Sequence, residues 1–324
     1  MTVASAAPLR STARASRTTL AIGRFLDHCR VAKRLSVNTL RAYECDLTDF
    51  LSYVGRNTVV TGIDREKVRS YARALLDERD LRETTVKRRL ATLRVLFRWM
   101  EREELVPLSV FHRLDLSIRL PRRLPRTLEP AEMSRLLQRT EVESRAHRGV
   151  GKYEALLMHF VVVALFTTGL RIGELVAVRL PDLGAVDGSI AIRGKGNRER
   201  RVYIPGRQAL RVLSRYLGAR RHINTQTDCL LVSGDGTCIT AQRIRKRMRE
   251  VAGRAGIRRS ITPHMLRHTA ATQLLEAGVD IRFVQRLLGH TSILTTQLYT
   301  EVRDVTLQAK LERANTLSRL RAFS

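Results

Sequence analysis

Four prolines in the middle of the chain constrain its architecture more than any other feature. Each removes a backbone donor and blocks a continuous helix, so no long helix can pass through this stretch. They are Pro107, Pro121, Pro125 and Pro130. The 324 residues are enough for two domains. We therefore predict a flexible basic tail over residues 1–17, a first domain over 18–106, a linker over 107–129 and a second domain over 130–324.

The chain is strongly basic. It holds 59 lysines and arginines against 31 acidic residues, a formal net charge of +28 at pH 7. Both predicted domains share the excess, which favours a polyanion such as DNA or RNA that contacts both of them. A basic surface that only keeps the protein soluble is the alternative. No run of 18 apolar residues occurs, so we expect no membrane-spanning segment.

The cysteines and the N-terminal tail indicate a cytoplasmic protein without a metal site. The four cysteines form no CxxC pair and do not group with histidines at zinc-ligand spacing, so we expect reduced thiols. They are Cys29, Cys45, Cys229 and Cys238. Residues 1–17 mix arginines with small residues and lack the apolar core of a signal peptide.

The first domain is predicted to be entirely helical, with helices over residues 18–33, 36–54, 64–78 and 84–104. In the last helix one face is apolar. That face carries Val86, Leu90, Leu93, Phe97 and Met100. Basic residues on its other faces are candidates for contacts with phosphates, although such faces are often only solvated. These candidates are Lys87, Arg88, Arg94 and Arg98.

The second domain is predicted to combine helices with a small antiparallel sheet. We expect helices near residue 130 and over residues 153–168, 208–222 and 241–255. Alternating apolar residues predict three strands, over 175–180, 189–194 and 200–205, and the turn GKGNRE between the last two exposes Lys195. The helix over 241–255 is a candidate for lying along a nucleic-acid groove. Its basic residues include Arg243, Arg245 and Lys246.

A helix is predicted to begin at Thr262-Pro263. Thr262 can cap it through its hydroxyl, and Pro263 suits the first helical position. His264 and Arg267 then lie side by side near the helix N-terminus, where anions are attracted. His268 follows one turn after His264.

A second short helix is predicted after Asp280. It should stop at Gly289, because glycine suits the left-handed position that follows a helix. His290 comes directly after this stop. Tyr299 lies nine residues further on, in or near a third short segment. Each of these residues taken alone is more often a core, turn or surface residue than a catalyst.

Arg171 and Glu174 stand in the phrase TTGLRIGEL, at a junction between two helices. Taken alone, they suggest an ordinary ion pair. The combination of this phrase with GKGNRERRVYIP, HMLRH, LLGH and TTQLY, in this order, resembles the tyrosine recombinases, also called the phage integrase family. It looks most similar to the Xer-type branch. The resemblance extends over roughly residues 18–310.

The resemblance implies a two-domain DNA clamp: a helical, SAM-like core-binding domain followed by an α+β catalytic domain. It implies a catalytic set of Arg171, Lys195, His264, Arg267, His290 and Tyr299. Glu174 and His268 would orient the residues of this set without binding the phosphate themselves. Tyr299 would form a 3′-phosphotyrosyl intermediate with DNA, without metal, ATP or any other cofactor.

The implied partner is double-stranded DNA with paired core sites. The implied assembly is a homo-tetramer, or a hetero-tetramer with a related recombinase, formed by docking of the C-terminal helix. A bacterial, nucleoid-associated protein of the cytoplasm is expected. The biological role stays open between chromosome-dimer resolution, prophage or island integration, and transposition. A non-catalytic DNA-binding or architectural protein and a type IB topoisomerase-like nicking enzyme are the alternatives.

Overall fold

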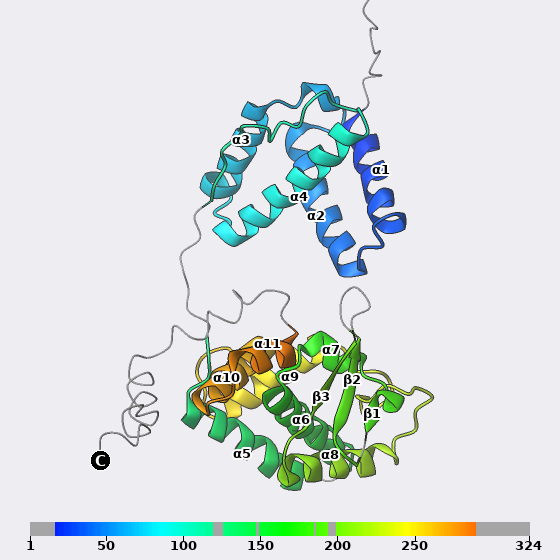
Figure 1. Cartoon of the computed structure of the whole chain (residues 1–324), viewed down its shortest axis with the longest axis vertical. Coiled ribbons are helices and arrows are strands. Elements are labelled where there is room, and N and C mark those ends of the chain that lie inside the picture. The colour runs from blue at the N-terminus through cyan, green and yellow to red at the C-terminus, as the bar shows by residue number, and fades with distance from the viewer. Residues whose placement is uncertain (1–16, 119–125, 147–148, 185, 194–198, 290–324) are drawn as a thin grey trace, which may run out of the picture. The chain divides into compact units, whose positions relative to one another are not determined.

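The computed structural model of the chain describes residues 17–118, 126–146, 149–184, 186–193 and 199–289. It divides into two compact units, residues 1–122 and residues 123–324 (Figure 1). The described residues are mainly helical, and those of the second unit add one three-stranded antiparallel sheet. The predicted fold class, mainly α with a small antiparallel sheet, is confirmed.

Unit 1 is a bundle of helices around an aromatic core. Its main helices are α1 (Thr18–Val31), α2 (Val37–Val54), α3 (Arg65–Arg73) and α4 (Glu83–Arg102). Ser36 and Asp64 cap α2 and α3 by accepting bonds from backbone amides. The predicted apolar face of α4 is buried along its whole length, which confirms it. The helix predicted over 64–78 is not one α-helix, because after Arg73 it continues as a π-helix, Ala74–Glu78.

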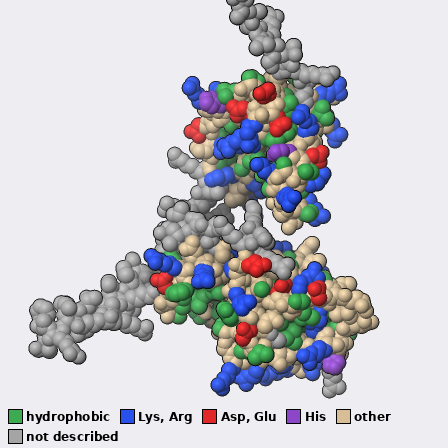
Figure 2. All heavy atoms as spheres, turned by 45° about the vertical axis from the view of Figure 1, so that its right-hand side comes forward, with side chains coloured by type: hydrophobic (Ala, Val, Ile, Leu, Met, Phe, Trp, Pro, Cys, Tyr) green, Lys and Arg blue, Asp and Glu red, His purple; other side chains and the backbone are tan. Residues whose placement is uncertain are grey.

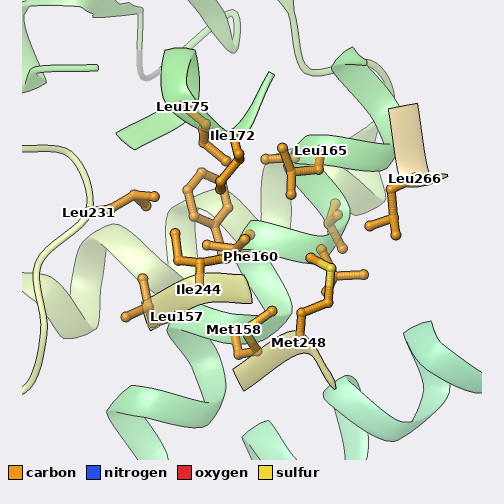
Figure 3. Packing of buried hydrophobic residues seen from close by; sticks show 14 of the residues in the cluster. Leu157, Met158, Phe160, Leu165, Ile172, Leu175, Leu231, Ile244, Met248 and Leu266 are labelled. Carbon is orange, nitrogen blue, oxygen red and sulfur yellow. The ribbon is translucent and has the colours of Figure 1, made fainter. Parts of the chain in front are cut away.

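Unit 2 is built around one apolar helix, α6 (Gly149–Thr168). Among the described residues of this unit, six further α-helices accompany it: α5 (Pro130–Ala146), α7 (Ile172–Ala177), α8 (Arg207–Arg220), α9 (Ala241–Arg254), α10 (Pro263–Glu276) and α11 (Ile281–Leu288). Phe160 lies at the centre of the core, with Leu157, Leu165 and Ile244 around it (Figure 3). By length and composition α6 could cross a membrane, but 72% of its apolar window is buried inside the unit, as expected for a core helix.

The sheet of unit 2 has the strand order β1 (Leu183–Gly184), β2 (Ser189–Arg193), β3 (Glu199–Tyr203). The hairpin of the last two strands is confirmed, with Ile190 opposite Val202. The first predicted strand, residues 175–180, is wrong. Its first half belongs to α7, because Glu174 accepts the backbone N–H of Arg171 and caps a short helix there. The sheet instead begins at Leu183.

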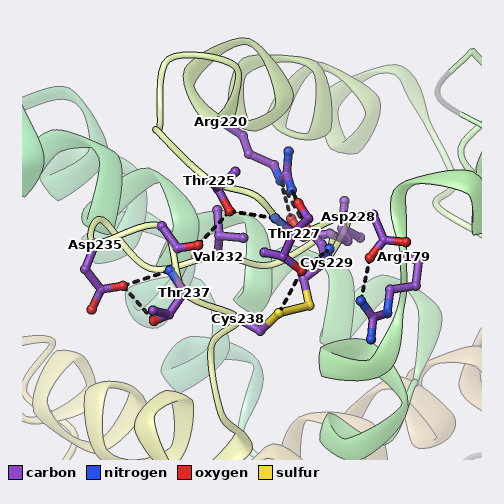
Figure 4. Close-up of a disulfide and its surroundings, with 12 residues drawn as sticks. Arg179, Arg220, Thr225, Thr227, Asp228, Cys229, Val232, Asp235, Thr237 and Cys238 are labelled. Atoms are coloured by element: carbon purple, nitrogen blue, oxygen red, sulfur yellow. Dashed lines mark hydrogen bonds and ion pairs between the residues drawn. A yellow bond between two sulfur atoms is a disulfide. The ribbon is translucent and has the colours of Figure 1, made fainter.

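The expectation of four reduced cysteines is also wrong for one pair. Cys229 and Cys238 form a disulfide, with 5.8 Å between their Cα atoms (Figure 4). An antiparallel bridge between Val232 and Cys238 folds the segment back on itself and brings the two sulfurs together. Their sequence separation of nine matches no familiar motif, so the pairing was invisible in the sequence. Cys29 and Cys45 are free.

Candidate active site

The N-terminal end of α10 has the local structure that its sequence predicts. The Thr262 hydroxyl accepts the backbone N–H of Met265, and Pro263 occupies the first helical position. α11 is likewise capped by Asp280 and ends at Gly289, whose φ of 63° is left-handed. Both predictions are confirmed. The caps fix where each helix begins and ends, and so they fix the direction of the side chains on it.

Arg267 is the most buried charged residue of this region, with only 4% of its surface exposed. Its guanidinium lies between the ends of two helices. Nη1 donates to the carbonyl oxygen of Gly169, just after α6, and Nη2 donates to that of Leu288 at the end of α11, each at 2.7 Å. Carbonyl oxygens at helix C-termini carry partial negative charge, which stabilises a buried cation. Arg267 therefore ties α6, α10 and α11 together.

Arg171 reaches the same place from the junction between α6 and α7. Its Nη1 donates to Glu174 at 3.0 Å and makes a long contact of 3.5 Å with the carbonyl oxygen of Leu288. Two arginines that are far apart in the sequence therefore meet at one carbonyl group. The Arg171 side chain keeps 40% of its surface exposed, in contrast to that of the buried Arg267.

Arg200 is a third arginine of this centre, and the sequence analysis missed it. It lies on β3 and donates to both carboxylate oxygens of Glu174, at 3.1 and 2.9 Å. Its Nε donates to the carbonyl oxygen of Leu287 at 3.3 Å. A signal was present in the sequence, because strand alternation puts residue 200 on the same face as buried Val202. An arginine at an inward-facing strand position needs a partner.

Glu174 is the one carboxylate among the described residues that contacts the guanidiniums of Arg171 and Arg200. Burial raises its pKa, but hydrogen bonds from Arg200 and the Arg171 backbone, with both positive charges, bring the pKa below its usual value. The carboxylate therefore stays ionised. Arg171, Arg200 and Arg267 supply three positive charges against its single negative charge, so this part of the site suits an anion.

The two histidines of α10 are held neutral at neutral pH. Partial desolvation lowers the pKa of His264, and the charges of Arg267, Arg245 and Arg171 lower it further. The pKa of His268 is lowered mainly by burial, and further because a proton on it would be repelled by the Arg267 guanidinium and by any proton on His264. A neutral imidazole can accept a proton or a hydrogen bond through one ring nitrogen and donate a hydrogen bond through the other, whereas a charged imidazole can only donate.

Three residues of the expected catalytic set, Lys195, His290 and Tyr299, lie outside the described residues. The structure brings Arg171, Glu174 and Arg267 together and puts His264 and His268 on the same helix as Arg267. In the part of the chain that the structure describes, no three His, Cys, Asp or Glu residues are arranged to hold a metal ion.

The basic candidates on α4 and α9 are exposed, as Figure 2 illustrates for Lys and Arg side chains on one face of each unit. Two of them have acidic partners. Arg88 pairs with buried Asp46, and Arg243 pairs with Asp235 at 3.5 Å and with Glu154 at 3.7 Å. No ion pair within the described residues involves the other candidates. These are Lys87, Arg94, Arg98, Arg245 and Lys246.

Residues 126–305 match the phage integrase family, and residues 22–104 match the N-terminal SAM-like domain of phage integrases. The chain belongs to the phage integrase family. Its enzymatic class is that of a tyrosine-type site-specific recombinase.

Individual relatives agree with this assignment over most of the chain. A tyrosine recombinase of Agathobacter rectalis is 33% identical over 285 residues, 87% of this chain and 91% of that protein. The tyrosine recombinase XerC of Listeria monocytogenes serotype 4a is 35% identical over 288 residues, 86% of this chain and 91% of that protein.

A solved structure shares the fold. It is the XerH site-specific recombinase bound to its palindromic difH substrate, with a TM-score of 0.71 at 21% identity. The match covers 96% of this chain and 99% of that one. None of these comparisons supports the architectural protein or the topoisomerase-like enzyme that the sequence left as alternatives.

Proposed function

We propose that Arg171 and Arg267 bind the scissile phosphate of DNA and that Tyr299 attacks it. The observation that carries the proposal is the convergence of the two guanidiniums on the carbonyl oxygen of Leu288. Guanidinium groups match the geometry of phosphate oxygens and never lose their charge. Two of them beside one phosphate neutralise the charge that develops on its non-bridging oxygens in the transition state.

The proposed reaction is a transesterification that needs no external energy source. The phenol oxygen of Tyr299 forms a bond to phosphorus while the bond between phosphorus and the 5′-oxygen breaks. Lys195 protonates that leaving oxygen. His264, which is neutral at working pH, and His290 position the phosphate, and an imidazole of this pair accepts the proton of the Tyr299 hydroxyl. The energy of the broken bond is kept in the 3′-phosphotyrosine, so the 5′-hydroxyl of a partner duplex can reverse the step and rejoin the strand. No metal, ATP or other cofactor enters the scheme.

The supporting contacts of the site suggest how its residues are held. Glu174 accepts the backbone N–H and the side chain of Arg171, and thereby holds this arginine at the start of α7. His268 lies half-buried one turn after His264 on α10. We assign both residues supporting roles rather than contact with the phosphate.

The domain organisation proposed for this function is that of a DNA clamp. Residues 18–106 are the core-binding domain, residues 107–129 the linker and residues 130–324 the catalytic domain. Exposed basic residues on α4 and α9 supply phosphate contacts that give affinity without sequence information. They are Lys87, Arg88, Arg94 and Arg98 on α4, and Arg243, Arg245 and Lys246 on α9.

A salt titration tests the surface proposed on α4. Replacing Arg98, which has no acidic partner among the described residues, with alanine should weaken binding to all duplexes about equally. It should lower the slope of log K against log salt by about 1, because one phosphate contact is lost. The matched control is Arg30→Ala on α1, since Asp27 already pairs with Arg30. Equal slopes for wild type and Arg98→Ala would remove Arg98 from the interface.

The proposed assembly is a tetramer on two paired core sites, of this chain alone or together with a related recombinase. Cyclic docking of residues 303–324, which lie outside the described residues, onto the neighbouring protomer would close the ring. Deleting residues 303–324 should then leave DNA binding intact and weaken cooperative assembly.

The proposed location of the protein is the bacterial cytoplasm, in association with the nucleoid.

Covalent trapping tests the reaction class. Purified protein and its Tyr299→Phe variant are mixed with nicked duplexes from the DNA that flanks the gene, without metal or ATP, and separated on a denaturing gel. We expect a protein–DNA adduct with wild type alone, and the trapped fragment identifies the core site. Tight binding of the same duplexes by wild type without any adduct would contradict the proposal and favour a non-catalytic DNA-binding protein.

A further inference from the structure

Arg200 joins three elements that are distant in the sequence. It lies on β3 opposite Ile192 of β2, and it binds Glu174 at the start of α7 and the carbonyl oxygen of Leu287 near the end of α11. All three Arg200 nitrogens take part in these bonds. An arginine with these three partners holds them in a fixed geometry, because its guanidinium is planar and its donors have set directions.

The Arg200 guanidinium and the Glu174 carboxylate are largely shielded from solvent. Only 16% of the Arg200 side chain and 13% of the Glu174 side chain are exposed. Gly289 is also close, since an added Cβ there would stand 2.9 Å from the Arg200 guanidinium. The positive φ favours glycine at this position, and a side chain there would crowd Arg200. The guanidinium is held in one position by the elements around it.

The Glu174 carboxylate is shared between two arginines. Oε1 accepts from Arg171 at 3.0 Å and from Arg200 at 3.1 Å, while Oε2 accepts from Arg200 at 2.9 Å and from the Arg171 backbone at 2.9 Å. If Arg200 were absent, the full negative charge of Glu174 would face Arg171 alone. Its attraction would compete with a phosphate for the same guanidinium.

We propose that Arg200 is a positioning residue for strand cleavage. Its guanidinium neutralises much of the negative charge of Glu174 and holds that carboxylate in place. Arg171 therefore stays directed at the scissile phosphate. The inference rests on the proposed role of Arg171. Arg200 does not touch the phosphate in this scheme. It also fixes the end of α11 to the same centre through Leu287.

Single-turnover cleavage of nicked duplexes by Arg200→Ala and Arg200→Lys tests this role. A guanidinium displaced by about 1 Å can cost about 100-fold in rate, so we expect a loss of that order for Arg200→Ala. Arg200→Lys should also lose activity, since an ammonium cannot bridge two carboxylate oxygens and a carbonyl oxygen together. Arg201→Ala is the matched control, because Arg201 is the exposed neighbour on the same strand. It should cleave like wild type.

A second substrate separates positioning from a general structural role. In a duplex with a methylphosphonate at the scissile position, one non-bridging oxygen is replaced by a methyl group and the negative charge is gone. If Arg200 acts through Arg171 on that charge, the loss caused by Arg200→Ala should shrink on this substrate, and the loss caused by Arg171→Ala should shrink with it. A variant that is merely misfolded would lose activity on both substrates alike.

The outcomes are distinct. Wild-type rates for Arg200→Ala, or equal losses on the phosphodiester and the methylphosphonate, would overturn the proposal for Arg200 and leave the proposed recombinase chemistry intact. If wild type itself formed no covalent adduct with DNA through Tyr299, the proposed function would fail instead. A loss on the phosphodiester that shrinks on the methylphosphonate, with DNA affinity close to wild type, supports it.

Discussion

Replacing Arg267 with alanine is expected to lower the rate of strand cleavage by about 10²- to 10³-fold, the usual cost of removing one donor that stabilises a developing anion. Arg267 is 4% exposed and donates to the carbonyl oxygens of Gly169 and Leu288. Its loss removes a charge from the phosphate site and leaves two buried carbonyl groups without this donor. The rate is measured by single-turnover formation of the covalent adduct on nicked duplexes.

Two further measurements test whether charge alone explains the role of Arg267. Arg267→Lys keeps the charge, but an ammonium cannot reproduce the two-pronged contact with Gly169 and Leu288, so it should also cleave slowly. DNA affinity should change little in both variants, because many other basic residues contribute to it. A cleavage rate near that of wild type in Arg267→Ala would remove this residue from the catalytic set.

Replacing Phe160 with alanine is expected to destabilise unit 2 by about 3–5 kcal/mol, the usual cost of removing a buried phenyl ring. The ring is fully buried and stacks on Tyr216, with 4.8 Å between centroids and 8° between planes. The melting temperature of unit 2 should fall by roughly 10 °C, since each kcal/mol corresponds to about 2–4 °C in a domain of this size.

Calorimetry of the full chain measures this shift. The single tryptophan, Trp99, is buried in unit 1, so its fluorescence follows that unit separately. Val142→Ala on α5 is the control, because Val142 is 50% exposed and an exposed side chain contributes within about 0.5 kcal/mol. An unchanged melting temperature in Phe160→Ala would mean that α6 is not the centre of the core.

The helices of this chain were largely predictable because their signals are local. The apolar face of α4, the threonine cap of α10 and the glycine stop of α11 each depend on residues within a few positions of one another. The predicted strand over 175–180 failed for the same local reason. Its alternating pattern was real, but the cap formed by Glu174 with the Arg171 backbone favoured a short helix over its first half.

Residues that depend on distant partners were not predictable from patterns. Nothing near Cys229 or Cys238 indicates that they pair, because the fold of the intervening segment brings them together. Arg200 was missed for a related reason. Its partners Glu174 and Leu287 come from other elements, and the motif around it draws attention to Lys195 instead.

The sequence by itself determined the basic character of both parts of the chain, the positions of most helices and the family to which its motifs belong. These properties depend on composition and on short-range order. Only the tertiary structure decided that Arg171, Arg200 and Arg267 meet around Glu174 and the carbonyl groups of Leu287 and Leu288. The reason is physical: the hydrogen bonds of a buried guanidinium are set by which helix ends pack beside it, and that packing is a property of the whole core.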